Sequence, residues 1–311
     1  MTDFIAIVIP AYNEKNNISP LVEKLDEVLK SSTYEFKYLF VDDGSRDGTR
    51  SVLEEKAKDH PNVSYISFSR NFGKDDALKA GIDACTGALA VITIDADLQH
   101  PPELIPQMID LWENGADIVY VYRDEANPHT SFFHRASSKA FYKLLNILSD
   151  IQVEEGMSDF RLIDQRAVEN LADIKETGLF LRGLVKWVGF SQKGITYKPD
   201  SRLHGNTTYS KWSLLKLAVQ GITAFSIKPL HLAVYIGFLF SVIALFYLPY
   251  VVFSLYMGMA VSGWASIIVS IVFFAGLQLS ILGIIGIYIG KIYIQVKSRP
   301  QYIIRRQNLK F

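Results

Sequence analysis

The chain has 311 residues, 32 of them basic and 32 acidic, and 49% of its residues are apolar. The charges are unevenly distributed, because residues 229–290 contain no Asp, Glu, Lys or Arg. A helix crosses a bilayer with about 20 apolar residues, so this stretch has room for two spans and a short turn. The composition therefore argues against an entirely soluble protein, and the ordinary charge content of residues 1–228 argues against a large polytopic channel.

The first part of the chain alternates short apolar runs with helical patterns. We expect strands over residues 4–10, 37–41, 63–68, 89–94 and 117–122, and helices over residues 18–30, 47–59, 75–84 and 102–114. This alternation is typical of an α/β protein with a mostly parallel sheet and helices on both faces. Such sheets bind ligands at the carboxyl ends of their strands, so the residues that follow each strand are the candidates for function.

Polar segments follow three of these strands. They are Pro10-Ala-Tyr-Asn-Glu14 after the first strand, Asp42-Asp-Gly-Ser-Arg-Asp-Gly-Thr49 after the second and Asp95-Ala-Asp-Leu-Gln-His-Pro-Pro102 after the fourth. The chain has no GxGxxG dinucleotide loop and no GxxxxGK[ST] phosphate loop, which argues against a dehydrogenase or a phosphate-loop NTPase. The recurrence of polar sets at strand ends of one sheet favours a binding site there.

Asp95 and Asp97 flank a single residue at the end of the fourth strand. Two carboxylates so close repel each other unless a cation lies between them, and oxygen ligands suit Mg²⁺ or Mn²⁺. The alternative is a polar turn in which Asp97 is the acid at the start of the next helix. Asp43 has two interpretations as well, because it either accepts hydrogen bonds from a nucleotide base or sugar or belongs to an ordinary Asp-Gly turn.

The two spans are expected at about residues 230–253 and 264–289, joined by an uncharged turn. Lys211, Lys216 and Lys228 precede the first span, and residues 291–311 carry six basic and no acidic side chains. The positive-inside rule then places both flanks in the cytoplasm. A basic segment beside a span predicts contact with anionic lipids rather than with nucleic acid. The segment before the first span is expected to be an amphipathic helix, lying in the membrane interface or packed on the soluble domain.

The three polar segments and the two spans together resemble the family 2 glycosyltransferases of the GT-A fold. The segments that carry the resemblance are Ile9–Glu14, Val41–Ser45 and Asp95–Pro102. More narrowly they are similar to the polyprenyl-phosphate glycosyltransferases, which include bactoprenol glucosyltransferases and dolichol-phosphate mannose synthases. The resemblance implies a Rossmann-like sheet and an inverting transfer of a sugar from a UDP-sugar to a membrane polyprenyl phosphate. Glucose is the first candidate for the sugar and undecaprenyl phosphate for the acceptor.

The resemblance also implies roles for individual residues. The nucleotide-sugar would be held by Pro10, Tyr12, Glu14, Val41, Asp43, Lys74, Asp95, Ala96 and Gln99, and the Mg²⁺ or Mn²⁺ ion by Asp95 and Asp97. The acceptor phosphate would be received by Arg123, Arg135 and Arg202. The alternatives are solvated surface charge for Arg123 and Arg135 and a solvated helix-start lysine for Lys74.

Asp159, in the segment Gly156-Met-Ser-Asp-Phe-Arg161, matches the family aspartate that lies close to the transferred sugar. We expect it to bind sugar hydroxyls or to orient the acceptor, and the alternative is a turn or cap acid. Proton abstraction is a weaker interpretation, because a phosphate monoester has its second pKa near 6 and is largely anionic at neutral pH. Arginine suits the acceptor side, because its planar fork binds phosphate bidentately.

Two departures from the family pattern bear on function. Thr207 and Thr208 stand where the family usually has Ser-Lys, so a basic contact from that loop to the diphosphate is missing unless Arg202 or Lys211 supplies it. The Gln-x-x-Arg-Trp motif of the processive synthases is absent from the sequence, which favours a single transfer over polymer synthesis.

We therefore expect a cytoplasmic GT-A domain over residues 1–209, an amphipathic helix over 210–228, a transmembrane hairpin over 229–290 and a basic cytoplasmic tail over 291–311 in the plasma or inner membrane. Further expected partners are anionic lipids, a second copy of the chain (with a tetramer as one option) and a downstream lipid flippase. The rival functions are transfer from another nucleotide-sugar or to another lipid acceptor, and an inactive membrane scaffold or flippase partner.

Overall fold

The computed structural model describes residues 3–123, 157–197, 223, 225–258 and 263–311. The strands are β1 (Phe4–Ala11), β2 (Glu35–Asp42), β3 (Val63–Phe68), β4 (Ala90–Thr93), β5 (Ile118–Arg123), β6 (Met157–Asp164), β7 (Gln192–Tyr197) and β8 (Ile304–Asn308). The helices are α1 (Ile18–Leu29), α2 (Thr49–Asp59), α3 (Lys74–Ala84), the short 3₁₀ helix η1 (Pro102–Leu104), α4 (Ile105–Glu113), α6 (Gln165–Asp173), α7 (Leu181–Trp187), α9 (Lys228–Tyr256) and α10 (Trp264–Val296). The strands and helices expected from the sequence in the first 123 residues are confirmed, with ends that shift by one or two residues.

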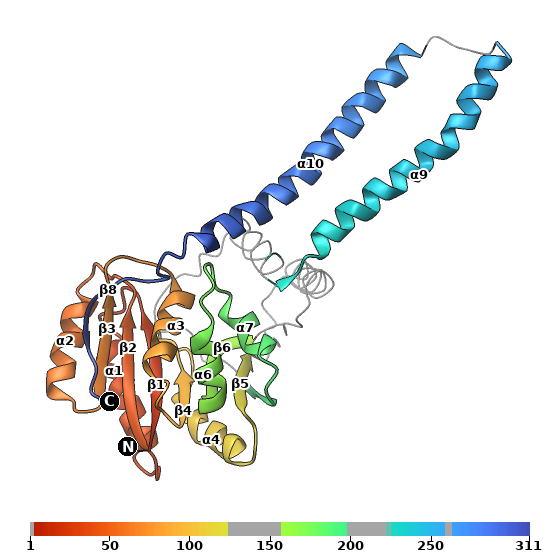
Figure 1. The fold of residues 1–311 in the computed structure, drawn as a ribbon. Helices are drawn as coiled ribbons and strands as arrows, with labels where there is room; N and C mark the ends of the chain where they lie inside the picture. Colours follow the sequence, from red (N-terminus) through yellow and green to blue (C-terminus); the bar gives the residue numbers. More distant parts are fainter. Residues whose placement is uncertain (1–2, 124–156, 198–222, 224, 259–262) are drawn as a thin grey trace, which may run out of the picture.

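The described strands form one sheet in the order β7-β5-β6-β4-β1-β2-β3-β8. β1 pairs in parallel with β2 and β4, and β2 pairs in parallel with β3. β6 lies between β4 and β5 and is antiparallel to both, so β4 and β5 point the same way. The fold is therefore the α/β architecture of the GT-A type, with a mixed sheet between two layers of helices (Figure 1).

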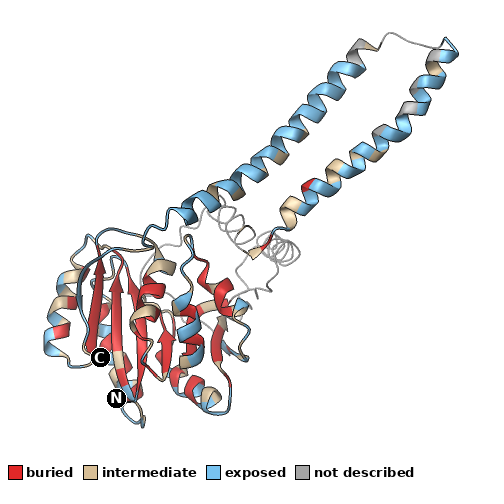
Figure 2. Cartoon of the chain, in the orientation of Figure 1, coloured by how far each residue is buried: buried red, intermediate tan, exposed pale blue. Residues whose placement is uncertain are grey.

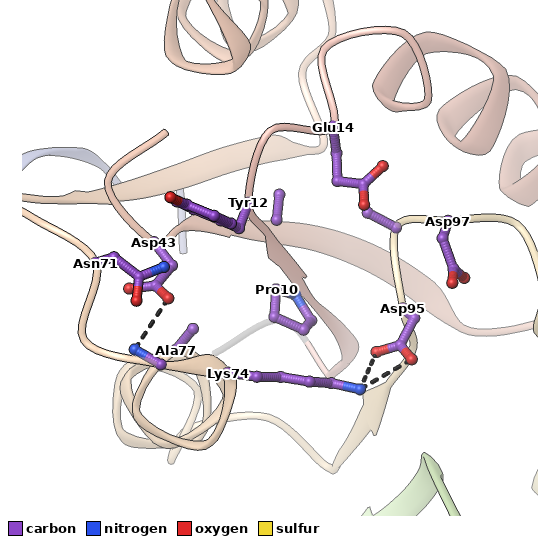
Figure 3. Close-up of a pocket in the computed structure, with 12 residues that line it drawn as sticks. Pro10, Tyr12, Glu14, Asp43, Asn71, Lys74, Ala77, Asp95 and Asp97 are labelled. Atoms are coloured by element: carbon purple, nitrogen blue, oxygen red, sulfur yellow. Dashed lines mark hydrogen bonds and ion pairs between the residues drawn. The ribbon is translucent and has the colours of Figure 1, made fainter. Parts of the chain in front are cut away.

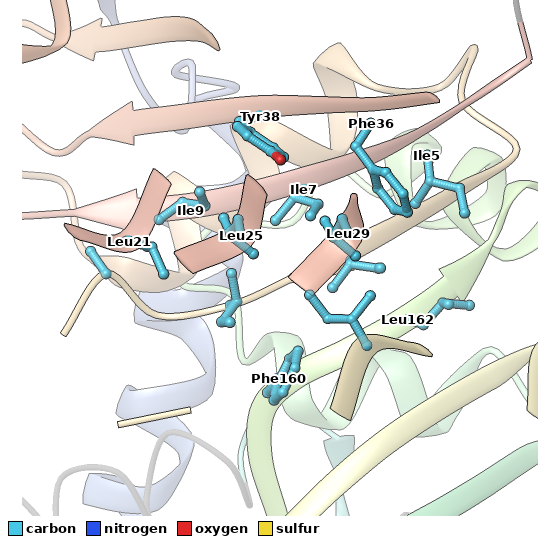
Figure 4. Packing of buried hydrophobic residues seen from close by; sticks show 14 of the residues in the cluster. Ile5, Ile7, Ile9, Leu21, Leu25, Leu29, Phe36, Tyr38, Phe160 and Leu162 are labelled. Carbon is cyan, nitrogen blue, oxygen red and sulfur yellow. The ribbon is translucent and has the colours of Figure 1, made fainter. Parts of the chain in front are cut away.

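The central strands β1, β3 and β4 are buried on both faces, as parallel strands covered by helices require (Figure 2). On one face Ile5, Ile7 and Ile9 pack in the cluster that includes α1, α2 and α4 (Figure 4). On the other face Val8 packs in the cluster that includes α3, α6 and α7. Gly81 lets α3 come close to the sheet there, because a Cβ atom on it would lie 2.2 Å from Val8 Cγ1.

The long helices α9 and α10 extend away from the sheet, and their exposed side chains are mostly apolar (Figures 1 and 2). Residues 228–254 and 266–296 are long and apolar enough to cross a membrane, which indicates a membrane-associated protein. Phe240 of α9 packs edge-on against Phe273 and Phe274 of α10. Most of the expected amphipathic helix, residues 210–222 and 224, lies outside the described residues.

After α10 the chain returns to the sheet, a course that the sequence analysis did not predict. β8 adds to the edge of the sheet by antiparallel pairing with β3. Just before β8 the Tyr302 ring stacks on Phe68 at a centroid distance of 5.1 Å, and its hydroxyl donates to Asp83 over 2.9 Å. The expected basic tail thus contains a strand. All five residues of this strand are exposed, so its sequence lacks the alternation of apolar and polar residues that identifies a half-buried strand.

The end of α10 also contacts the segment between α6 and α7. Gln295 Oε1 accepts a hydrogen bond from the Thr177 amide over 2.9 Å, and Gln295 Nε2 donates to the Lys175 carbonyl over 2.9 Å. These contacts join the last turns of an apolar helix to the loop that precedes α7. The sheet and the long helices are therefore connected through side chains as well as through the backbone.

Candidate active site

The three polar segments that follow β1, β2 and β4 meet at one edge of the sheet, because these strands are neighbours and run in the same direction. Together with the start of α3 they enclose a pocket of about 390 Å³ (Figure 3). The described residues that line it are Pro10, Ala11, Tyr12, Glu14, Asp43, Asn71, Gly73, Lys74, Ala77, Asp95, Ala96 and Asp97. The sequence prediction that these segments lie together is confirmed.

Asp43 is held by backbone groups at the far end of the pocket from Asp95 (Figure 3). Its carboxylate accepts hydrogen bonds from the amides of Phe72 at 2.6 Å and Gly73 at 3.0 Å. Burial raises the pKa of Asp43, and the two amide donors act in the opposite direction. Gly44 permits the close approach of the next loop, since it has a φ of +70° and a Cβ atom would lie 2.4 Å from the Arg70 carbonyl carbon.

Asp42 and Asp43 are adjacent in sequence but serve different purposes. Asp42 is buried and accepts hydrogen bonds from the Ser67 hydroxyl at 2.6 Å and the Ser45 amide at 2.9 Å, which fixes the loop. Asp43 lines the pocket. The ligand-facing role that the sequence analysis expected for Asp43 is therefore compatible with its position.

Asp95 and Lys74 form an ion pair across the pocket (Figure 3). The Lys74 ammonium lies 2.7 Å from Asp95 Oδ1 and 2.9 Å from Asp95 Oδ2. Asp97 Oδ1 accepts a hydrogen bond from the Gln99 amide at 3.1 Å, in a turn where Leu98 has a φ of +61°. This turn places both carboxylates beside the pocket within three residues of the chain.

The ring of His100 packs between the backbone of Asp95 and the ring of Phe160. Burial is the main cause that lowers the pKa of His100, so the neutral imidazole is favoured. Its Nδ1 accepts a hydrogen bond from the Asp95 amide over 3.3 Å, and the ring stacks on Phe160 at a centroid distance of 5.4 Å. The sequence analysis did not identify this contribution of His100, which depends on packing against β6.

The oxygen donors at this edge fit a hard divalent cation. Among the residues that the structure describes, no group of three or more His, Cys, Asp and Glu side chains could hold a metal ion by itself. Mg²⁺ and Mn²⁺ bound to nucleotides usually take only one or two protein carboxylates, and waters and phosphate oxygens complete the coordination. Asp95 and Asp97 match that requirement, and the residues present therefore suit a metal that binds with its substrate.

Asp159 anchors a buried ion cluster next to the pocket. Its carboxylate receives two hydrogen bonds from Arg182, from Nε at 2.7 Å and from Nη2 at 2.8 Å. Lys74 lies 2.7 Å from Asp159 Oδ2, and Arg161 lies 3.7 Å from Oδ1. Burial alone would raise the pKa of Asp159, but the hydrogen bonds and charges of these three cations hold it well below its usual range.

An ionised Asp159 surrounded by cations is a poor proton acceptor at neutral pH. This geometry is compatible with the expected role in binding or orienting rather than in proton abstraction. The bidentate partner Arg182 belongs to α7, and the sequence analysis did not name this residue. Only the three-dimensional contact between β6 and α7 shows the pair.

The remaining expected site residues lie elsewhere or outside the described part of the chain. Val41 is fully buried in the core cluster beneath α3, and Gln99 belongs to the turn after Asp97; neither is among the described residues that line the pocket. Arg123 is the last residue of β5, at the same edge of the sheet as the pocket. Arg135 and Arg202 lie outside the described residues.

Comparison with known proteins identifies the class. The family model described as glycosyl transferase family 2 matches residues 6–172, which include both carboxylate sets of the pocket and Asp159. The chain therefore belongs to glycosyl transferase family 2. It is also close to the bactoprenol glucosyl transferases along nearly its whole length.

The bactoprenol glucosyl transferase of Shigella phage SfII is 39% identical over 305 residues, covering 98% of this chain and 98% of the relative. A prophage bactoprenol glucosyl transferase homolog of Escherichia coli is 39% identical over 303 residues, covering 97% of this chain and 98% of the relative. Among solved structures, mannosyl-3-phosphoglycerate synthase from Rubrobacter xylanophilus has a TM-score of 0.47 and 17% identity, covering 71% of this chain and 72% of that one.

Proposed function

We propose that this glycosyltransferase moves a sugar from a UDP-sugar to a membrane polyprenyl phosphate, with inversion at the anomeric carbon. Glucose and undecaprenyl phosphate are the first candidates for sugar and acceptor, in line with the names of the relatives. The observation that carries the proposal is the pocket at the ends of β1, β2 and β4, which combines Asp43, Asp95 and Asp97. The sugar would leave on a lipid that serves later glycan modification.

The pocket offers a separate contact for each part of the donor. Asp43 would accept hydrogen bonds from the uracil or ribose, and the ring of Tyr12, which is 45% exposed, offers a stacking surface for the base. Lys74 lies toward the other end of the pocket and can reach the diphosphate (Figure 3). Asp95 and Asp97 would hold the divalent ion, which as a Lewis acid would neutralise the charge on the departing diphosphate.

The acceptor supplies its own nucleophile. An anionic phosphate oxygen attacks C1 of the sugar, the C1–O bond to the UDP breaks, and its electron pair leaves on the diphosphate, so no proton has to be removed. The protein must instead bring two anions together, which requires cations on both sides. Arg123, Arg135 and Arg202 are the residues proposed for the acceptor phosphate. Arg182 holds Asp159 in a fixed orientation, and Asp159 would lie beside the transferred sugar.

The two apolar helices give the reaction its membrane setting. α9 and α10 would cross the membrane as a hairpin, with the sheet and both flanks on the cytoplasmic side, where UDP-sugars are available. Positive residues of the segment after α10 would contact anionic lipids there. Glycines let membrane helices approach closely, so the α10 helices of two chains would pack against each other through the glycines of α10. The oligomer expected from the sequence stays a prediction.

The test of this function is direct. Purified full-length protein in mild detergent is incubated with labelled UDP-glucose and undecaprenyl phosphate, with Mg²⁺ or Mn²⁺ and with chelator. We expect a labelled lipid that releases its sugar in mild acid, as a sugar linked to a polyprenol through a phosphodiester does. A panel of other UDP-sugars in the same assay identifies the donor. A label that appears only in an acid-stable lipid would favour an acceptor such as diacylglycerol, and no labelled lipid with any donor would favour the inactive scaffold.

A further inference from the structure

Lys74 bridges two carboxylates that belong to different parts of the site. Its ammonium nitrogen contacts both oxygens of Asp95, at 2.7 and 2.9 Å, and Asp159 Oδ2 at 2.7 Å. The lysine is the first residue of α3 and follows Gly73, whose φ of +118° turns the chain into the helix. The side chain thus crosses the pocket from the α3 side to the β4 side (Figure 3).

This position conflicts with a divalent ion on Asp95. Mg²⁺ binds carboxylate oxygen at about 2.0–2.1 Å, and both Asp95 oxygens are already engaged by the ammonium. A metal placed on Asp95 would lie within a few ångströms of a second positive charge, and the two would repel each other. Metal binding at Asp95 is therefore opposed by the Lys74 ammonium for as long as the ammonium stays on these oxygens.

The rest of the cluster permits such a movement. When Lys74 leaves, Asp159 still has the bidentate contact from Arg182 and the charge of Arg161. The buried carboxylate would therefore stay paired, and no uncompensated buried charge would result. The Lys74 side chain is 43% exposed, so its flexible stem can turn within the open pocket.

We propose that Lys74 is a positioning residue that neutralises Asp95 before the donor binds and moves to the donor diphosphate as the metal takes its place. The inference rests on the proposed nucleotide-sugar donor and adds an order to its binding. A divalent ion without a nucleotide competes with the Lys74 ammonium for Asp95. When the ion binds together with the donor, the diphosphate oxygens provide new anionic partners for the ammonium. Metal and donor then increase each other's affinity, since such coupling is reciprocal.

The test measures metal binding without turnover. Full-length wild-type protein and the variants Lys74→Met, Lys74→Arg and Lys24→Met are titrated with Mn²⁺ in detergent, and free Mn²⁺ is followed by electron paramagnetic resonance. Lys24→Met is the matched control, because it removes a lysine that pairs with Glu103 outside the pocket. We expect Lys74→Met to bind Mn²⁺ at least about ten-fold more tightly than wild type without nucleotide, while the other two variants stay near wild type.

A second titration with saturating UDP completes the test. UDP should raise the Mn²⁺ affinity of wild type by a larger factor than that of Lys74→Met, because the variant has no ammonium to displace. Equal or weaker Mn²⁺ binding by Lys74→Met in the absence of UDP would overturn the inference. If Lys74→Met does not fold, Lys74→Gln serves in its place, with the fold checked by circular dichroism.

The inference and the proposed function can fail separately. The Mn²⁺ titration needs neither acceptor nor sugar transfer, so an enzyme with another acceptor would still give the expected ten-fold difference. Conversely, transfer to polyprenyl phosphate in the labelled assay together with unchanged Mn²⁺ affinity in Lys74→Met would uphold the function and reject the role of Lys74.

Discussion

The two sides of the site are built in different ways. On the side proposed to bind the donor, called the donor side below, Asp43 and Asp95 lie in the loops that follow β2 and β4. Two backbone amides hold the Asp43 carboxylate, and the ion pair with Lys74 holds that of Asp95. On the other side, Asp159 lies within β6, and its partners Arg182 and Lys74 come from α7 and α3. We therefore expect that removing a charge on the donor side leaves the stability of the fold nearly unchanged. The Asp159 carboxylate is buried, so removing its charge should lower both activity and stability.

The largest effect is expected on the donor side. Asp95→Asn removes one of the two proposed metal ligands but keeps the size of the side chain, so sugar transfer should fall by about a thousand-fold or more. The melting temperature should change little, because Asp95 lies in the open pocket. Labelled-sugar transfer and differential scanning fluorimetry check both parts. Activity within ten-fold of wild type would remove Asp95 from the metal site.

Asp159→Asn should lower activity and stability together. It leaves the buried Arg161 and its neighbour Arg182 without their carboxylate, and breaking a buried pair in this way costs about 3–5 kcal/mol. Urea unfolding of both proteins at pH 7 measures the difference. A variant as stable as wild type would contradict the buried-cluster account.

The pH dependence of this difference has a definite sign. The pKa of Asp159 is depressed in the folded state, so its stabilising contribution is complete above the ordinary pKa of an aspartate and is lost as the pH falls through the lower folded value. The stability difference between wild type and Asp159→Asn should therefore be equal at pH 7 and pH 5.5. It should shrink only below about pH 4.

Arg182→Lys tests whether the fork of the arginine matters more than its charge. Lysine keeps the positive charge but cannot make two parallel hydrogen bonds to Asp159. We expect kcat to fall by about ten-fold, with a smaller change in KM for the UDP-sugar, because Asp159 stays ionised but loses its orientation. A change in KM alone would indicate that Arg182 contacts the donor instead. Lys186→Arg, a change in the same helix outside the cluster, is the control.

Asp76 gives a smaller effect on stability. Burial, followed by the charges of Asp75 and Asp43, raises its pKa to about 7. Because the folded pKa is raised, the stabilising contribution of Asp76 is complete only below the ordinary pKa of an aspartate, about 4, and it is lost as the pH rises from there through about 7. Asp76→Asn should therefore be more stable than wild type at pH 8.5 by about 1–2 kcal/mol, after allowance for its partial exposure, and this advantage should be clearly smaller at pH 5.

Thermal unfolding at the two pH values checks this prediction. The exposed Asp59, at the end of α2, provides the control variant Asp59→Asn. An identical pH dependence of stability in wild type and Asp76→Asn would contradict the shift. The charge of Asp43 is one of the causes that raise the pKa of Asp76. The same experiment therefore measures how much stability the protein loses when a second carboxylate near Asp43 is ionised.

The contrast between the two sides also explains what the sequence could predict. Asp43, Asp95 and Asp97 directly follow strands that an apolar pattern reveals, and neighbouring parallel strands bring their carboxyl ends together. The contact of Arg182 with Asp159, in contrast, depends on how α7 packs against β6, for which the sequence has no local signal. The same holds for the contact of His100 with Asp95.

The C-terminal segment shows a second limit. Apolar content located the two long helices, but α10 continues past Lys291 to Val296. β8 was missed because an exposed edge strand of polar residues has neither alternation nor an apolar run. Its contacts, such as the stacking of Tyr302 on Phe68, are tertiary.

The most direct test of the central claim is UDP binding to the donor side, measured by isothermal titration calorimetry on the purified full-length protein. The claim is that Asp95 and Asp97 hold the donor diphosphate through a divalent ion. We predict that wild type binds UDP in the presence of Mn²⁺ and that chelator or Asp95→Asn weakens this binding by at least about ten-fold. UDP affinity that is unaffected by both the chelator and the substitution would contradict the account.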